Sequence, residues 1–224
     1  MLRLLAIGDV HGCLTALDTL LGFVQPTPDD QLVFLGDYVD RGPDSKGVLN
    51  RLIELQGSGQ ITFLRGNHEI MMLGARNGRD DFRFWFACGG SEAMESYARP
   101  NGIVTLEDIP DSHWQFLDRC VDWHETETHI FVHAGLHPDL PLDKQPTDWL
   151  HWQPLSERLH RPHCSGKTMI CGHTHQRSGI PLRLVRAVCI DTWVYGDGWL
   201  TCLDVESGEY WQANEFGQTR IGER

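Results

Sequence analysis

The chain has 224 residues, of which 41% are hydrophobic, and its formal net charge is −12 at pH 7. This length and composition predict a single domain, residues 1–224, with a continuous core. The acidic balance argues against a protein that coats long nucleic acids, because such binding depends on Lys and Arg neutralising phosphates. No apolar run reaches the roughly 18 residues of a membrane span and no signal-peptide pattern opens the chain, so we expect a soluble, cytoplasmic protein that does not bind membranes.

The seven cysteines are an odd number, none of them lies in a C-x-x-C pair, and several stand inside apolar runs. A reduced thiol behaves in such a run as a small hydrophobic group. We therefore expect neither a disulfide framework nor a zinc site made of cysteines.

Three apolar runs in the first third of the chain are typical of buried strands: residues 2–7, 32–36 and 61–64. Apolar residues recur at helical spacing after each run, in residues 14–21, 44–55 and from residue 70 onward. Each strand is therefore expected to lead through a short turn into a helix. Each of these turns carries polar or charged residues directly after its strand.

Residues 77–128 predict a mostly helical insert, with a turn at residues 100–102 and a short helix over residues 112–121. Its aromatic cluster is expected to pack on the core, with the lining of a substrate pocket as the alternative; the cluster is Phe82, Phe84, Trp85 and Phe86. Residues 137–165 are rich in Pro, His and Trp and have weak periodicity. We interpret them as a long excursion that is either functional or mobile.

Further apolar runs in the second half of the chain predict strands at residues 129–132, 168–171 and 187–190. The C-terminal part predicts a hairpin in which residues 199–205 and 209–213 flank a Ser-Gly turn. No fixed-period repeat or shift in composition marks a second domain.

Five of the predicted strands end in a small residue next to a side chain that can bind a metal. These side chains are Asp9 and His11, Asp37, Asn67, His133, and His173 with His175. In open α/β sheets the ligand crevice lies beyond the carboxyl ends of the strands, so five such endings can converge on one point. A lone histidine is more often a hydrogen-bonded surface or core residue, but the repetition at strand ends favours one shared site.

Carboxylate, imidazole and amide ligands without thiolate suit divalent ions such as Mn²⁺, Fe²⁺ or Zn²⁺ rather than a structural zinc site. At least six donors are more than one ion with an open catalytic position needs. The set therefore indicates two ions, about 3.5 to 4 Å apart, that share a carboxylate. Asp37 is the candidate for the shared ligand.

Five motifs in this order resemble the phosphoprotein phosphatase branch of the calcineurin-like metallophosphoesterases, small bacterial serine/threonine phosphatases in particular. The motifs are GDxHG, GDxxDRG, GNHE, HAG and GHT, at residues 8–12, 36–42, 66–69, 133–135 and 172–174. The resemblance implies an α/β fold in which helices flank a central β-sandwich, in the layer order α/β/β/α. It also implies hydrolysis by a hydroxide that bridges two divalent ions, Mn²⁺ being expected first and Fe²⁺, Zn²⁺ and Mg²⁺ being the alternatives.

The resemblance also implies a role for each motif residue. The first ion would bind Asp9, His11 and Asp37, and the second would bind Asp37, Asn67, His133 and His173. His68 would be the general acid, oriented by Asp40, and Arg41 would bind the phosphate. The alternatives from the residues themselves are a helix cap for His68 and a surface ion pair for Arg41.

The chain departs from the family pattern at two places. The family commonly has a second phosphate-binding arginine between HAG and GHT, after a tryptophan, but here Trp152 is followed by Gln153 and Pro154, and Arg158 or Arg161 would have to substitute. The GHT motif is followed by His175, which is expected to complete the first ion's ligands, with a free or supporting histidine as the alternative.

The predicted function is that of a metal-dependent protein serine/threonine phosphatase, with a phosphoprotein or a small phosphorylated molecule as its substrate. The alternative within the family is a symmetrical diadenosine tetraphosphatase. Glu69, which follows His68, favours the protein phosphatases, because the dinucleotide hydrolases typically have aspartate there. A non-catalytic metal-binding protein on the same fold is disfavoured because the ligand set is complete.

Overall fold

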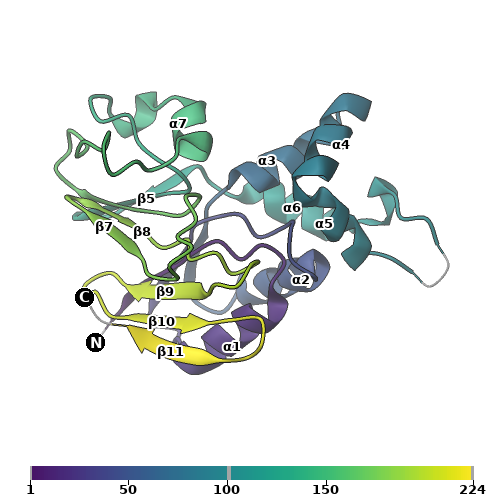
Figure 1. Cartoon of the computed structure of the whole chain (residues 1–224), viewed down its shortest axis with the longest axis horizontal. Helices are drawn as coiled ribbons and strands as arrows, with labels where there is room; N and C mark the ends of the chain where they lie inside the picture. The colour runs from purple at the N-terminus through teal and green to yellow at the C-terminus, as the bar shows by residue number, and fades with distance from the viewer. Residues whose placement is uncertain (1, 100–101, 223–224) are drawn as a thin grey trace.

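A computed structural model describes residues 2–99 and 102–222 of the chain. Two β-sheets form the centre of the molecule; in Figure 1, α1 lies beside β10 and β11 of the first sheet, α2 lies to the right of these strands, and α7 lies above the second sheet. This arrangement confirms the predicted β-sandwich flanked by helices. The turn predicted at residues 100–102 lies mostly outside the described residues.

The first sheet has six strands within the described residues, in the order β11-β10-β9-β1-β2-β3. Their bounds are β1 Leu4–Ile7, β2 Gln31–Phe34, β3 Gln60–Phe63, β9 Leu200–Asp204, β10 Tyr210–Ala213 and β11 Thr219–Gly222. Strands β1, β2 and β3 are parallel, and Ile7, Phe34 and Phe63 are paired at their last positions. The carboxyl ends of these three strands are therefore level with one another. The predicted C-terminal hairpin is confirmed as the antiparallel pair β9 and β10.

The second sheet has five strands in the order β4-β5-β6-β8-β7 among the residues described. Their bounds are β4 Trp123–Glu125, β5 His129–Val132, β6 Thr168–Cys171, β7 Leu182–Leu184 and β8 Ala187–Cys189. Strands β5, β6 and β8 are parallel. Strands β4, β7 and β11 were not predicted; each has only three or four residues and lies at a sheet edge, where little apolar patterning is required.

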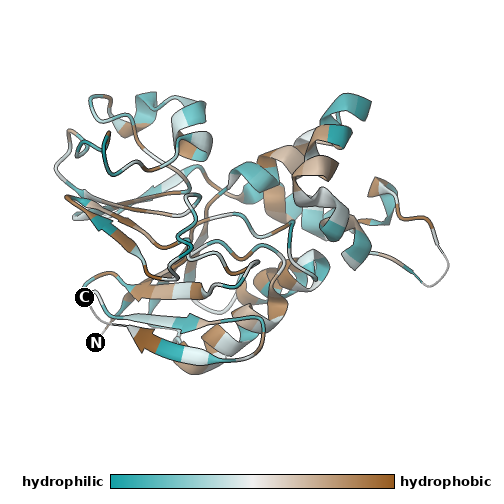
Figure 2. Cartoon of the chain, in the orientation of Figure 1, coloured by the Kyte–Doolittle hydropathy of each residue, from teal (hydrophilic) through white to brown (hydrophobic). Residues whose placement is uncertain are grey.

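Alternate residues of the central strands face two different layers of the core. Leu4 and Ala6 of β1 join the cluster between the sheets, whereas Leu5 and Ile7 pack towards the helices of the first sheet. Both faces are buried, which explains why the sequence shows continuous apolar runs. Figure 2 shows hydrophobic residues concentrated on strands and on α1, and hydrophilic residues on α7 and at the tip of α4.

The helices follow the strands as the apolar spacing predicts. Their bounds are α1 Leu14–Val24, α2 Ser45–Leu55, α3 Asn67–Gly74, α4 Arg79–Trp85, α5 Ser91–Ser96, α6 Asp111–Arg119 and α7 Thr147–Trp152, with a π-helical turn at Phe86–Gly90 and 3₁₀ turns at Leu106–Asp108 and Leu142–Lys144. All the helices in the described residues are too short or too polar to cross a membrane.

Two segments differ in detail from their predictions. Trp85 is fully buried, but Phe84 and Phe86 are 58% and 44% exposed, so only part of the aromatic cluster packs on the core. The excursion over residues 137–165 contains α7 and packs on the second sheet through Leu150 and Leu155. All seven cysteines are free thiols in the structure.

Candidate active site

The structure brings nine of the ten predicted site residues into one contact network at the carboxyl ends of the parallel strands. Asp9 and His11 follow β1, Asp37, Asp40 and Arg41 follow β2, Asn67 and His68 begin α3, and His133 and His173 follow β5 and β6. These strands come from both sheets, so the site lies where the two sets of strand ends meet. His175 is the exception and is described below.

Backbone strain is concentrated in this network. Eight described non-glycine residues have a positive φ, and five of them are predicted site residues: His11, Asp37, Asp40, Arg41 and His173. A left-handed backbone is unfavourable for residues with a Cβ and persists only when surrounding contacts hold it. Holding these five residues in this conformation lowers the stability of the fold, and it directs their side chains towards one point.

Three histidines present a free lone pair to the centre of the site. Each has one ring nitrogen at hydrogen-bond distance from a backbone carbonyl, in the pairs His11 Nδ1–Val39 O (3.1 Å), His133 Nδ1–Leu35 O (2.9 Å) and His173 Nε2–Trp152 O (3.2 Å). Burial lowers the pKa of each ring, and that of His133 to about 3. The rings are therefore neutral, and the nitrogen that does not donate to a carbonyl is available to a metal.

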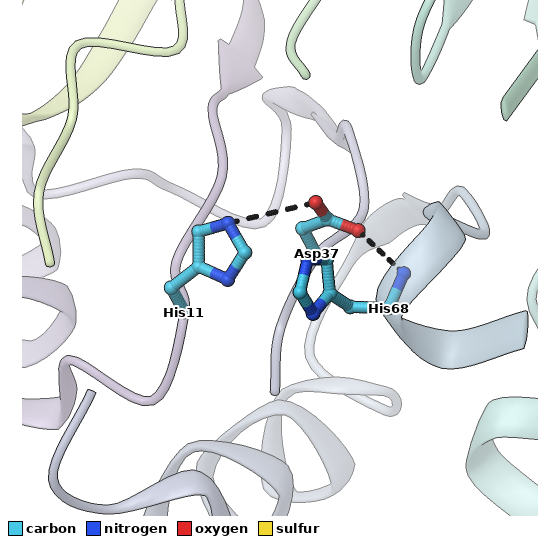
Figure 3. A group of neighbouring side chains, drawn as sticks. All are labelled: His11, Asp37 and His68. Carbon is cyan, nitrogen blue, oxygen red and sulfur yellow. Dashed lines mark hydrogen bonds and ion pairs between the residues drawn. The ribbon is translucent and has the colours of Figure 1, made fainter. Parts of the chain in front are cut away.

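Two groups of candidate ligands share the carboxylate of Asp37. His11 Nε2 lies 3.5 Å from Asp37 Oδ2 on one side, and His133 Nε2 lies 3.4 Å from Asp37 Oδ1 on the other. Figure 3 shows His11 facing one oxygen of Asp37 while the backbone N–H of His68 donates to the other at 3.0 Å. The potential ligand atoms of His11, Asp37 and His68, and those of Asp37, His133 and His173, lie within 4.8 Å of one another. This is the geometry expected of two neighbouring cation sites.

The second group brings several potential ligand atoms close together. The carbonyl oxygen Oδ1 of Asn67 lies 3.0 Å from His133 Nε2 and 3.0 Å from His173 Nδ1, and both nitrogens carry lone pairs. Asp9 Oδ1 is a buried oxygen without a hydrogen-bond partner. Because buried polar atoms are normally satisfied, these atoms fit divalent ions as their missing partners.

His68 is the outer member of a buried hydrogen-bonded chain. Its Nδ1 lies 2.7 Å from Asp40 Oδ2, and Trp85 Nε1 donates to Asp40 Oδ1 and Oδ2 at 2.9 and 3.0 Å. Burial lowers the pKa of His68, but the carboxylates of Asp37 and Asp40 outweigh it and raise that pKa above its usual value. The arrangement keeps a proton on His68 near neutral pH, as a general acid requires.

Arg41 faces the candidate ligands. Its Nη1 lies 3.1 Å from His11 Nε2, and its guanidinium carbon lies 4.7 Å from the centroid of the Tyr195 ring. No ion pair among the described residues includes Arg41, so the alternative of a surface ion pair finds no support there. The guanidinium is placed where an anion beside the cation sites would meet it.

His175 and the two alternative arginines lie outside the contact network. His175 is exposed and stacks on the ring of Trp193, with the centroids 6.2 Å apart. Arg161 pairs with Asp139 at 2.7 Å in an exposed ion pair, and Arg158 lines a surface hollow with His175. The role of His175 as a metal ligand stays a prediction.

Two motif glycines are required by the carboxylates that they approach. A Cβ added at Gly172 would lie 1.9 Å from Asp9 Oδ1, and one added at Gly66 would lie 2.1 Å from Asp37 Oδ1. Both distances are far inside van der Waals contact. The glycines of the GHT and GNHE motifs therefore make room for the ligands of the site.

Glu69 is a buried residue that holds the backbone of the site in place. Its fully buried carboxylate accepts hydrogen bonds from three backbone N–H groups: Asp37 at 2.7 Å, Tyr38 at 2.7 Å and Gly66 at 2.8 Å. This carboxylate fixes the turn after β2 to the start of α3. Both carboxylate oxygens of Glu69 are occupied by these hydrogen bonds. The presence of glutamate here instead of the shorter aspartate is therefore weak evidence about the substrate.

Sequence reasoning did not identify Trp193 or Tyr195 as part of the site, and it considered Trp85 only within an aromatic cluster whose alternative role was to line a substrate pocket. Trp85 reaches Asp40 across 45 positions of sequence and belongs to no motif. One signal was present: a Cβ added at Gly90 would lie 2.5 Å from the Trp85 ring, so the Gly-Gly pair marks a close approach.

The comparison with protein families decides what kind of site this is. The family profile described as calcineurin-like phosphoesterase matches residues 2–177, which include every motif residue discussed above. The chain belongs to the calcineurin-like phosphoesterase family. The family and the ligand groups both agree with the predicted class of enzyme, a metal-dependent phosphoesterase.

Two activities appear among the curated relatives of this chain. The symmetrical bis(5′-nucleosyl)-tetraphosphatase of Janthinobacterium sp. (strain Marseille) is 33% identical over 141 residues, which is 59% of this chain and 43% of that protein. Serine/threonine-protein phosphatase 1 of Salmonella typhimurium is 35% identical over 134 residues, 57% of this chain and 56% of that protein. The matched region thus spans about half the length of these relatives.

Solved structures confirm the fold over nearly the whole chain. A candidate diadenosine tetraphosphatase superposes with a TM-score of 0.69 at 22% identity and covers 98% of this chain and 93% of its own. A cold-active protein-tyrosine phosphatase from a psychrophilic Shewanella superposes with a TM-score of 0.65 at 19% identity, over 99% of this chain and 80% of its own.

Proposed function

We propose that this phosphoesterase hydrolyses the polyphosphate chain of a dinucleoside polyphosphate such as diadenosine tetraphosphate, using two divalent ions. The observation that carries the proposal is the pair of ligand groups that share Asp37. Curated tetraphosphatases recur among its relatives, in Janthinobacterium and Cellvibrio japonicus for example. The predicted preference for phosphoproteins depended on Glu69, and both oxygens of that buried carboxylate accept hydrogen bonds from backbone N–H groups.

In this proposal the residues present divide into two ion sites. One ion would be held by Asp9, His11 and Asp37, and the other by Asp37, Asn67, His133 and His173, with Mn²⁺ as the ion expected first. Two such ions supply a nucleophile derived from water and neutralise phosphoryl oxygens. His175 is kept as a further candidate ligand of the first ion.

The remaining residues bind and protonate the substrate. Arg41 presents its planar guanidinium to non-bridging phosphate oxygens, beside His11. His68 has its Nδ1 tied to Asp40, so its Nε2 is the atom that donates a proton to the leaving oxygen. Asp40 orients the ring and keeps it charged.

A protein serine/threonine phosphatase is the second candidate, because the Salmonella relative with that name is 35% identical to this chain. A direct comparison of kcat/KM for diadenosine tetraphosphate and for a phosphoserine peptide, with Mn²⁺ supplied, separates the two. We expect the dinucleotide to be preferred by at least tenfold and ADP to be its product, since a symmetrical cut divides four phosphates equally. A preference for the peptide would overturn the proposal and support a protein serine/threonine phosphatase instead.

A further inference from the structure

The turn that joins Thr192 to Trp199 carries two aromatic side chains, Trp193 and Tyr195, that have no role in the proposed hydrolysis. Trp199 N donates to Thr192 O at 2.9 Å, and Gly196 N donates to Trp193 O at 3.1 Å. Val194 is buried between Trp193 and Tyr195, and these two rings are half-buried and meet edge to face, 6.2 Å apart. The turn therefore holds both rings together at the surface. We call Trp193 and Tyr195 the aromatic wall.

Trp193 has an energetically unfavourable backbone conformation. Its φ is 65°, a left-handed value that is rare for a residue of this size. The backbone N–H of Trp193 donates to Asp191 Oδ1 at 3.0 Å, which holds the turn in this conformation. Strain that surrounding contacts maintain is typical of functional positions.

Tyr195 connects the aromatic wall to the phosphate end of the site. Its ring lies 4.7 Å from the His11 ring, in an edge-to-face contact, and 4.7 Å from the guanidinium carbon of Arg41. His11 is a candidate metal ligand and Arg41 the candidate phosphate ligand. A molecule whose phosphate meets Arg41 therefore has an aromatic surface directly beside it.

Positive charge borders the aromatic wall at its other end as well. The guanidinium carbon of Arg177 lies 5.1 Å from the centroid of the Trp193 ring, and the His175 ring stacks on that ring at 6.2 Å. Both side chains are exposed, so a bound base would take the place of one of them. Two arginines on two rings stand out in a chain with a net charge of −12. The combination is complementary to a ligand that is both anionic and flat, because aromatic faces and guanidinium planes both stack on such groups.

We propose that the aromatic wall is a base-binding subsite, in which the base of a nucleoside 5′-phosphate group stacks while its phosphates lie at Arg41 and the ion sites. The assignment rests on the proposed function, since it names the part of a dinucleotide that the site would recognise. A serine or threonine side chain has no flat group to place there. The subsite therefore gives the phosphoesterase a way to prefer nucleotides over phosphoserine.

The test compares binding of ADP with binding of inorganic pyrophosphate, each measured by calorimetry in the presence of Mn²⁺. Trp193→Gly removes the ring and suits the left-handed backbone, so the turn is kept. We expect this variant to raise the ratio of the ADP Kd to the pyrophosphate Kd by about tenfold or more, which corresponds to about 1.4 kcal/mol. Trp193→Phe, which keeps a ring, should restore most of the ratio.

The matched control is Trp199→Leu, at the other end of the same turn, where the ring contacts Arg220 at 4.3 Å. It should leave the ratio within about twofold of the wild-type value. If Trp193→Gly weakened the binding of ADP and of pyrophosphate equally, the inference would be overturned. A larger loss of affinity for O-phosphotyrosine than for ADP would also overturn it. If diadenosine tetraphosphate is not hydrolysed but the ratio still rises, the proposed function fails and the base subsite stands.

Discussion

Trp85 Nε1 donates a hydrogen bond to both carboxylate oxygens of Asp40, at 2.9 and 3.0 Å. Asp40 in turn holds Nδ1 of His68, so one fully buried indole fixes the group that orients the proposed general acid. The contact joins the end of α4 to the turn after β2. The helical insert is thereby connected to the chemistry of the site, although it contributes no ligand of its own.

Trp85→Phe should lower kcat by about tenfold while KM changes little. Phenylalanine keeps most of the ring volume but cannot donate to Asp40, so Asp40 and His68 lose their fixed orientation. The measurement is kcat with Mn²⁺ for phenyl phosphate and for p-nitrophenyl phosphate. Because the nitrophenolate leaves without needing a proton, the loss should be much smaller for that ester. Equal losses for both esters would point to a general structural defect.

Asp40→Asn should move the alkaline fall of kcat to lower pH. The carboxylate of Asp40 raises the pKa of His68, so its removal lowers that pKa, and the acid loses its proton at a lower pH. The pH profile of kcat measures this shift directly. Trp85→Phe keeps the carboxylate and serves as the comparison; an alkaline limb that stays in place in Asp40→Asn would exclude His68 as the acid.

Gly172→Ala should release metal without unfolding the chain. The added methyl group would overlap Asp9 Oδ1, at 1.9 Å, and would push that carboxylate out of the first ion site. Metal analysis of the purified variant should show about one ion fewer than the wild type. Gly22→Ala is the control, because a Cβ at this position in α1 meets nothing within 4 Å. A Gly172→Ala variant with full metal content would contradict the proposed role of Asp9.

Asp30 is not part of the candidate site. Asp30→Asn should lower the free energy of unfolding by about 1 to 3 kcal/mol at pH 7. The guanidinium of Arg3, at 2.6 Å, and two N–H groups hold the pKa of Asp30 well below its usual range. Because the pKa of Asp30 is lower in the folded state, the ionised carboxylate stabilises the fold at pH values above its unfolded-state pKa of about 3.9. This stabilisation is lost as the pH falls towards the folded-state pKa.

Denaturant unfolding at several pH values measures the effect of Asp30→Asn. The difference from the wild type should be full above about pH 5 and should shrink progressively below about pH 4. Asp18→Asn is the control, since its ion pair with Arg51 is exposed and should matter by less than about 1 kcal/mol. A difference that does not depend on pH would show that charge is not the source of the stability.

The strand ends and their motif residues could be predicted from sequence because each is a local signal: an apolar run, a small residue and a ligand. Nine side chains meet where the order of strands implies. Trp85 could not be predicted in the same way, because its partner Asp40 is 45 residues away and only packing of the insert brings them together. The edge strands β4, β7 and β11 were missed because none of their residues is fully buried, so they show no apolar run.

The substrate was the least predictable property. Glu69 was interpreted as a guide to specificity, but its position in sequence beside His68 gives no sign that its side chain turns back to three backbone N–H groups. Trp193 and Tyr195 lie in a turn outside the motifs, and their contacts with Arg177 and Arg41 exist only in the folded chain. Geometry, and not residue type, decides which groups face the substrate.

Metal analysis of Asp37→Asn tests the central claim, that one carboxylate joins two ion sites. The wild type saturated with Mn²⁺ should bind two ions per chain, and His173→Asn should lose one. Asp37→Asn should retain close to none, because Asp37 belongs to both ligand groups. Circular dichroism confirms that each variant is folded. A folded Asp37→Asn variant that keeps two tightly bound ions, or a wild type that binds only one, would contradict the account.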